Sequence, residues 1–204
     1  MVKLVLLAAA LGSASAFAPA PSAGSSTAAN AFANGMVGGE GPEPMPFTTA
    51  GTSVNFDPCG FAERAPEWLP WFREAELKHG RAAMLATAGM VVPEFVRIPG
   101  EQFSFENIPR VIEAHDKLPE SMIQIFGWIS FVEACSFAAL ANMNEYDRAP
   151  GDFGFDPIGL FPTDPEKQKE MQLAELKNGR LAMIAIGGMV AGASITGNGF
   201  PYLL

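Results

Sequence analysis

The chain has 204 residues, of which 49% are hydrophobic and 17% are charged, and its formal net charge at pH 7 is −9. This acidic balance excludes a nucleic-acid-binding protein, because phosphate binding needs a basic face. The low charged fraction, with 21 glycines and 10 methionines, favours a membrane protein over a soluble domain. Cys59 and Cys135 are too few for a disulfide framework or a thiolate metal site, so we interpret both as small apolar residues.

The N-terminal residues are typical of a two-step targeting signal. Residues 1–16 combine a short apolar run with small residues at Ala14 and Ala16, the A-x-A pattern of a signal-peptidase site. Residues 17–33, with an approximate end, hold Ser, Thr, Ala and Asn without an acidic residue, as transit peptides do. The string ASAFAP resembles the junction used for import into plastids of secondary, red-algal origin. Plain secretion with a disordered propeptide is the alternative.

Two short motifs occur twice at one spacing. The string 76-ELKHGR-81 returns as 175-ELKNGR-180, and 56-FDPCGF-61 returns as 155-FDPIGL-160, each 99 residues further on (175 − 76 and 155 − 56). Two matches in one register indicate a duplicated unit, in which a turn containing Pro and Gly precedes a helix.

Three membrane-spanning helices are expected within a single domain over residues 34–204. The two repeat helices are predicted at about residues 72–97 and 166–196. Between them, residues 122–143 hold one acidic or basic side chain, that of Glu133, and are long enough to cross a hydrocarbon core. One intervening span makes the first and third helices parallel. The sequence therefore predicts an all-α membrane protein whose first and third helices form a crossed, pseudo-symmetric pair.

The glutamate and arginine of each repeat need partners on another helix. They are five residues apart, about 140° around a helix, so they do not face each other. If the two repeat helices cross as a symmetric pair, Glu76 meets Arg180 and Glu175 meets Arg81. Such a clasp neutralises charges that are expensive inside a bilayer.

A side chain with a metal-ligating lone pair stands three residues after each glutamate: His79 in the first repeat and Asn178 in the second. Carboxylate, imidazole and amide groups spread along two helices are poorly placed to hold one Zn²⁺. They are well placed as single axial ligands for several Mg²⁺ centres that arrive already held in macrocycles. A carboxylate paired with arginine supplies such a ligand without leaving net charge in the membrane.

The pattern E-x-x-[HN]-x-R-x-A-M in two copies, each preceded by FDP-x-G, and the string 151-GDFGFDPIGL-160 resemble the light-harvesting chlorophyll-binding proteins of thylakoids. The resemblance covers about residues 54–199. With the plastid signal, it implies the fucoxanthin chlorophyll a/c-binding type, multi-pass in the plastid thylakoid membrane of a secondary red-lineage alga. The implied cofactors are chlorophyll a, chlorophyll c and fucoxanthin, with peridinin as the alternative carotenoid, and other xanthophylls. Magnesium enters only as the chlorophyll centre.

The resemblance also implies roles for single residues. Four match the family's chlorophyll ligands: Glu76, His79, Glu175 and Asn178. Two match the charge-compensating partners of those ligands: Arg81 and Arg180. On the middle helix, Gln124 and Glu133 are candidates for further ligands, and Glu133 is favoured because an unpaired carboxylate at mid-membrane has few structural explanations. Asp57 and Asp156, in the FDP-x-G loops, are candidate contacts for carotenoid head groups, or they only stabilise turns.

Two positions depart from the family pattern or stay outside it. Where the family often has a glutamine ligand late in the third helix, this sequence has Gly192. That chlorophyll is then missing, water-ligated, or replaced by close packing of another helix. We interpret His115, before the middle helix, as a solvated loop residue.

The leading functional hypothesis is an antenna that passes excitation energy to a photosystem I or II core, among other antenna subunits and thylakoid lipids. An enzyme is disfavoured, because neither a paired nucleophile and base nor a nucleotide-binding loop is recognisable. A photoprotective, energy-dissipating member of the same family is the first alternative. A small transport protein and a pigment-poor photosystem assembly factor are the others, and bound pigment would separate them from the antenna.

Overall fold

The computed structural model describes residues 32–38, 57–141 and 148–202. The predicted signal peptide, and the transit peptide up to residue 31, lie outside the described residues. The chain divides into two compact units; two of the three boundaries between them fall within long helices, and the third lies between Leu160 and Phe161, before the last helix. The first unit comprises Met1–Glu74 and Ala134–Leu160, and the second comprises Ala75–Glu133 and Phe161–Leu204.

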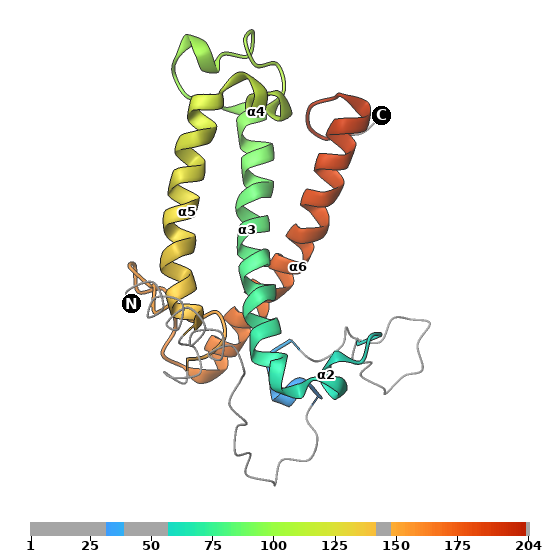
Figure 1. Cartoon of the computed structure of the whole chain (residues 1–204), viewed down its shortest axis with the longest axis vertical. Coiled ribbons are helices and arrows are strands. Elements are labelled where there is room, and N and C mark those ends of the chain that lie inside the picture. The colour runs from blue at the N-terminus through green and yellow to red at the C-terminus, as the bar shows by residue number, and fades with distance from the viewer. Residues whose placement is uncertain (1–31, 39–56, 142–147, 203–204) are drawn as a thin grey trace, which may run out of the picture. The chain divides into compact units, whose positions relative to one another are not determined.

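Three long helices make the chain mostly helical: α3 (Leu69–Phe95), α5 (Pro119–Ala141) and α6 (Pro165–Thr196) (Figure 1). Single turns make up the rest: η2 (Phe32–Gly35), α2 (Phe61–Arg64), η3 (Pro66–Trp68), η4 (Glu101–Phe103), η5 (Val111–Glu113) and α4 (Ala114–Lys117). No strand occurs in the described ranges, which confirms the all-α class for them.

The long helices start earlier than expected because proline opens them. Both α3 and α5 begin three residues before the predicted positions and end two residues before them. Pro70 is the second residue of α3, Pro119 is the first of α5 and Pro165 is the first of α6. Proline suits the first helical turn, where its missing N–H would have no partner in any case.

Two helices are long and apolar enough to cross a membrane: α5 over Pro119–Ala138 and α6 over Pro165–Thr196. None of the α5 segment is buried within the chain, and Phe126 and Trp128 are 71% and 72% exposed. Apolar side chains exposed along a whole helix fit an apolar environment such as lipid or bound pigment. The third predicted span, in α3, is not among the described helices that meet this criterion, so the three-span arrangement stays a prediction.

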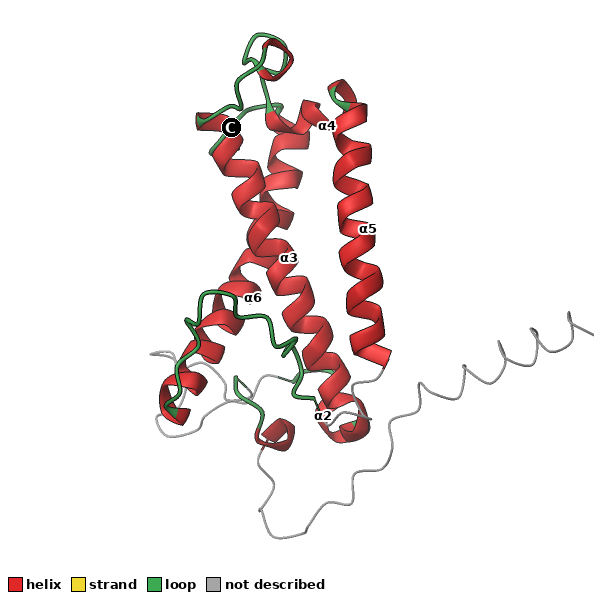
Figure 2. Ribbon diagram, turned by 90° about the vertical axis from the view of Figure 1, so that its left-hand side faces the viewer, coloured by secondary structure: helices red, strands yellow, loops and turns green. Residues whose placement is uncertain are grey.

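The second unit contains the crossing of α3 and α6 (Figure 1), and the view turned by 90° shows the same crossing (Figure 2). Two glycines permit the close approach, because a Cβ atom added to Gly80 would lie 3.0 Å from the Cα of Gly179. Leu176, Ala83 and Ala182 are buried near this contact. The first part of α5 runs beside α3 in both views.

His115 differs from its expected local structure. It lies in the one-turn helix α4 rather than in a loop, because residues 114–117 close a single helical turn. Its side chain is 83% exposed and lies 3.5 Å from the Asp116 carboxylate. The expected solvated environment is therefore present, although the backbone is helical.

Candidate functional site

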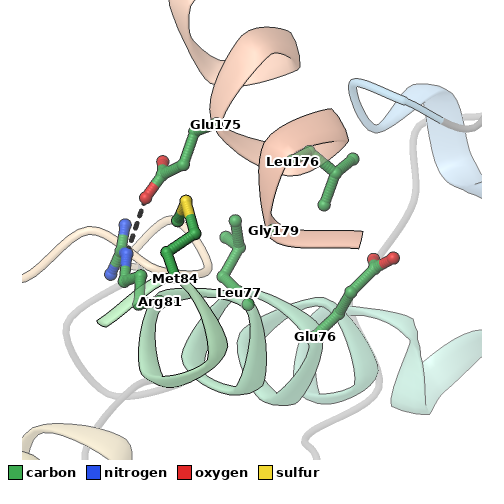
Figure 3. Close-up of a pocket in the computed structure, with 8 residues that line it drawn as sticks. Glu76, Leu77, Arg81, Met84, Glu175, Leu176 and Gly179 are labelled. Atoms are coloured by element: carbon green, nitrogen blue, oxygen red, sulfur yellow. Dashed lines mark hydrogen bonds and ion pairs between the residues drawn. The ribbon is translucent and has the colours of Figure 1, made fainter. Parts of the chain in front are cut away.

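Two reciprocal ion pairs join α3 to α6 at their crossing. The Arg81 Nε atom donates to Glu175 Oε1 at 2.7 Å (Figure 3), and Arg180 Nε donates to Glu76 Oε1 at the same distance. All four side chains are part-buried. The structure thus brings together both pairs that the spacing of the repeats predicts.

The crossing itself is too tight to hold a pigment. A small depression there has about 160 Å³ of empty space, part of it open to solvent, and is lined by residues of both helices. In Figure 3 the lining side chains of Leu77, Met84 and Leu176 surround Gly179. A ligand of tetrapyrrole size would therefore contact only the outer faces of the helix pair.

The side chains of His79 and Asn178 are held in the same way on their two helices. His79 Nδ1 lies 2.7 Å from the Ala75 carbonyl oxygen, and Asn178 Nδ2 donates to the Ala174 carbonyl at 2.8 Å. A carbonyl oxygen only accepts, so this contact needs a proton on Nδ1, and the neutral imidazole with that proton has its lone pair on Nε2. Asn178 keeps its Oδ1 acceptor in the same way. Both side chains are exposed, so His79 Nε2 and Asn178 Oδ1 are available at the helix surface.

Glu133 is not the unpaired carboxylate that the sequence suggested, which corrects the reason given for it as a ligand. Its Oε2 atom forms an ion pair with Lys78 Nζ, so α5 is joined to α3 by opposite charges. Gln124 is an exposed residue of α5, nine positions before Glu133 and about 180° around the helix. The structure does not bring Gln124 and Glu133 together.

The candidate ligands divide by charge. The three carboxylates, Glu76, Glu175 and Glu133, each pair with a cation from a different helix. The two neutral side chains, His79 and Asn178, are each oriented by a carbonyl of their own helix. In residues 57–141 and 148–202, no three His, Cys, Asp or Glu side chains form a cluster that could hold a bare metal ion. The arrangement suits separate metal centres that arrive with most of their coordination already satisfied.

Asp57 and Asp156 stabilise equivalent turns in the first unit. Asp57 accepts hydrogen bonds from the backbone N–H groups of Phe61 at 3.1 Å and Ala62 at 2.8 Å, and Asp156 accepts from Leu160 at 3.0 Å. The hydrogen bond from Ala62 lowers the pKa of the Asp57 carboxyl below its ordinary value. The turn-stabilising role is thus visible, whereas the contact with a carotenoid stays a prediction.

Gly192 packs against the chain's own C-terminal turn rather than against another helix. A Cβ atom added there would lie 2.7 Å from the carbonyl oxygen of Tyr202. Tyr202 is 4% exposed, and its hydroxyl donates to the Met90 carbonyl at 3.0 Å. This turn fills the space beside α6 at the position where a side-chain ligand was considered.

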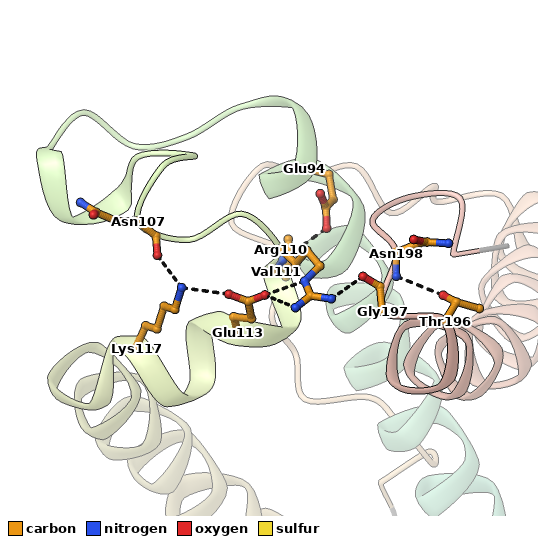
Figure 4. A network of polar contacts seen from close by, with 9 residues as sticks. All are labelled: Glu94, Asn107, Arg110, Val111, Glu113, Lys117, Thr196, Gly197 and Asn198. Atoms are coloured by element: carbon orange, nitrogen blue, oxygen red, sulfur yellow. Dashed lines mark hydrogen bonds and ion pairs between the residues drawn. The ribbon is translucent and has the colours of Figure 1, made fainter. Parts of the chain in front are cut away.

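A polar network in the second unit joins the segment between α3 and α5 to the end of α6 (Figure 4). Arg110 forms an ion pair with Glu113 and donates to the Gly197 carbonyl. Lys117 Nζ lies 2.9 Å from Glu113 and donates to the Asn107 carbonyl at 2.8 Å. Glu113 is the hub of the network because it receives both cations.

Sequence reasoning missed a buried ion pair in the first unit. Glu74 is 4% exposed, lies 3.1 Å from Arg148 Nη2 and accepts a hydrogen bond from the Gly151 backbone N–H. The repeat carries no signal for it, because Leu173 stands 99 residues after Glu74. Glu74 anchors the start of the segment 151-GDFGFDPIGL-160.

Comparison with known proteins identifies the family. A sequence model of the family described as chlorophyll A-B binding protein matches residues 42–194. The chain belongs to this family. The resemblance carried by the two motif copies is thereby confirmed.

Relatives of this chain include fucoxanthin-chlorophyll a-c binding proteins and light-harvesting stress-related proteins. The fucoxanthin-chlorophyll a-c binding protein of Chattonella marina var. antiqua is 40% identical over 93% of this chain and 86% of its own length. A protein of the same name from Isochrysis galbana is 37% identical over 82% of this chain and 80% of its own length. The light-harvesting complex stress-related protein 3.2 of Chlamydomonas reinhardtii is 40% identical over 72% of this chain, which spans 61% of that protein. All three are described as chloroplastic.

Proposed function

We propose that this chain is a light-harvesting antenna protein that binds chlorophyll a, chlorophyll c and fucoxanthin and passes excitation energy to a photosystem. Membership of the chlorophyll-binding family supports pigment binding, and the names of the Chattonella and Isochrysis relatives support the choice of pigments. Peridinin and other xanthophylls are not part of the proposal. The protein performs no bond chemistry in this role.

The observation that carries the proposal is the division of candidate ligands by charge. The Mg²⁺ of a chlorophyll is neutralised by its dianionic macrocycle, so a carboxylate ligand leaves one negative charge, whereas an imidazole or amide leaves none. A charge left in the membrane is costly. Glu76, Glu175 and Glu133 have cationic partners, whereas His79 and Asn178 form no ion pair with any of the described residues. This is the pattern that chlorophyll ligation requires at each position.

We propose that α3 is the third membrane span. Its 27 residues extend about 40 Å, more than the roughly 30 Å of a hydrocarbon core. Its charged residues near the crossing, Glu76, Lys78 and Arg81, each have a partner of opposite charge. The reciprocal pairs support a pseudo-twofold relation between α3 and α6, with the axis along the membrane normal.

In the proposed function, the residues of the crossing keep the bound pigments at fixed distances and orientations. Each ion pair connects one ligand-bearing turn of α3 to one of α6, and the two glycines bring the helix backbones close together at the crossing. Energy transfer depends on pigment distances and orientations, so a rigid crossing is what an antenna needs. We propose that the protein lies in the plastid thylakoid membrane of a red-lineage alga, beside a photosystem core and other antenna subunits.

Photoprotective dissipation is the second candidate, because the stress-related protein of Chlamydomonas matches at an identity equal to that of the Chattonella relative. The two functions differ in the fate of excitation under acidification. An antenna keeps its chlorophyll fluorescence lifetime when the pH is lowered from neutral to mildly acidic. A dissipating protein shortens that lifetime.

Pigment analysis with an absorption spectrum, on protein isolated gently from its own membranes, tests the proposal. We expect chlorophylls a and c with fucoxanthin, and chlorophyll fluorescence excited by light that the carotenoid absorbs. If the protein is folded but colourless, the ion pairs and the residues beside them only hold the helices together and bind no pigment. The assembly and transport hypotheses would then lead.

A further inference from the structure

Among the described residues, the ion pair between Lys78 and Glu133 has no counterpart in the second copy of the sequence repeat. Both residues belong to the second unit, with Lys78 on α3 and Glu133 on α5. Within α5 no Lys, Arg or His is present, so the helix that carries this glutamate supplies no cation of its own. The charge that neutralises Glu133 comes from α3.

We propose that Lys78 is the positioning residue of a chlorophyll site on α5, where it supplies the positive charge that allows Glu133 to ligate the magnesium. This inference rests on the proposed function. A carboxylate has two oxygens and several acceptor directions, so an ion pair at Oε2 is compatible with a metal at the same carboxylate. Lys78 would act through Glu133, as outer partners of metal ligands do, and would not touch the metal itself.

Comparison of the two repeats shows that the E-L-K string does not by itself place its lysine in an ion pair. Lys177 stands 99 residues after Lys78, at the same position of the second E-L-K string. Lys177 is exposed and forms no ion pair with any residue in the part of the chain that the structure describes. The two lysines thus share their motif position and their charge, but only Lys78 faces a glutamate of α5.

Lys78→Met and Lys177→Met form a matched pair of variants for the test. In full chains loaded with pigment, we expect Lys78→Met to lose about one chlorophyll per polypeptide, because the uncompensated Glu133 would no longer ligate. Lys177→Met should keep the wild-type chlorophyll content. Glu133→Leu should remove the same absorption band as Lys78→Met. Full chlorophyll content in Lys78→Met would overturn the inference.

A double variant distinguishes charge compensation from a simple clasp between helices. In Lys78→Met with Glu133→Gln, the amide still offers an oxygen ligand but carries no charge, so the lost chlorophyll should return. If Lys78 only clasps α3 to α5, the neutral pair restores nothing, and this result would overturn the inference. The double variant decides the matter even if Lys78→Met alone yields no stable protein.

The wild-type chain and Lys177→Met report on the proposed function separately. If both bind chlorophyll and only the Lys78 variants fail to behave as expected, the antenna proposal stands and this inference falls. If the wild-type chain binds none, the proposed function falls first.

Discussion

At the scale of single residues, the candidate site avoids net charge in the membrane in two ways. Glu76 and Glu175 bring negative charge and are matched by arginines, whereas His79 and Asn178 bring none and are only oriented. A neutral ligand is thus expected to be removable without loss of the fold. A charged partner is not, because its removal leaves the opposite charge behind.

His79→Leu should therefore remove about one chlorophyll and leave the helical content unchanged, because a side chain that ligates one metal centre is lost while no charge is stranded. Chlorophyll per polypeptide and circular dichroism measure the two effects. His115→Leu is the control, since the other histidine of the chain is 83% exposed in α4. Unchanged stoichiometry in His79→Leu would exclude it as a ligand.

Arg180→Leu should prevent the accumulation of stable, pigment-loaded protein, because Glu76 would lose its partner. Breaking a buried ion pair costs about 3 to 5 kcal/mol, and this part-buried pair is expected near the lower end. The yield of pigmented protein and its thermal midpoint are the measurements. Adding Glu76→Gln should recover much of the yield. Full pigment content in Arg180→Leu alone would contradict the reciprocal-pair arrangement.

At the scale of elements, the crossing of α3 and α6 depends on backbone contact. Gly80 and Gly179 are each so close to the other helix that a methyl group would meet main-chain atoms at 3.0 and 3.1 Å. Backbone atoms cannot rotate away as the end of a side chain can. The helices would have to separate, and the ion pairs beside the glycines would lengthen.

Gly80→Ala is expected to destabilise the protein by about 1 to 3 kcal/mol, the usual range for overpacking. Gly89→Ala, in the same helix, is the matched control because nothing lies within 4 Å of its added Cβ. Alanine favours a helix over glycine by up to about 1 kcal/mol, so the control should be neutral or stabilising. Thermal unfolding of the pigmented protein compares them. Equal midpoints would show that the helices do not meet at Gly80.

At the scale of the whole molecule, the segment between α3 and α5 is tied to the end of α6 through Glu113 (Figure 4). Lys117 and then Arg110 lower the pKa of the Glu113 carboxyl below its ordinary value of 4.5. A carboxyl with a lowered folded-state pKa contributes stability that is present above its unfolded pKa. That contribution is lost only as the pH falls through the folded value.

Acidification from neutral pH toward 4.5 should thus leave the network closed, and opening should begin only below that value. Hydrogen exchange of residues 101–118, corrected for the intrinsic rate at each pH, measures the opening. Glu113→Gln should raise exchange at every pH. Opening in mildly acidic buffer would mean that another group controls this segment. If the prediction holds, this network is not a sensor of mild acidification.

Much of the fold and site was predictable because the relevant information is local or repeated. The repeat and the apolar length located the helices to within three residues, and the prolines that open them account for the earlier starts. The spacing of Glu, His or Asn, and Arg within one helical turn and a half selected the candidate ligands, and the repeat at 99 residues paired Glu76 with Arg180 and Glu175 with Arg81. Whether those residues ligate chlorophyll stays a prediction.

The sequence by itself determined the helices, the family and the symmetric ion pairs. The helices follow from local apolar runs, and the family and the ion pairs follow from the motif that recurs after 99 residues. Only the tertiary structure decided which lysine faces Glu133, which cation reaches Glu74, and what covers Gly192. Lys78 and Glu133 are 55 positions apart, and Glu74 and Gly151 are 77 apart. No repeat or helical period links such positions, so their contact follows only from how the helices pack.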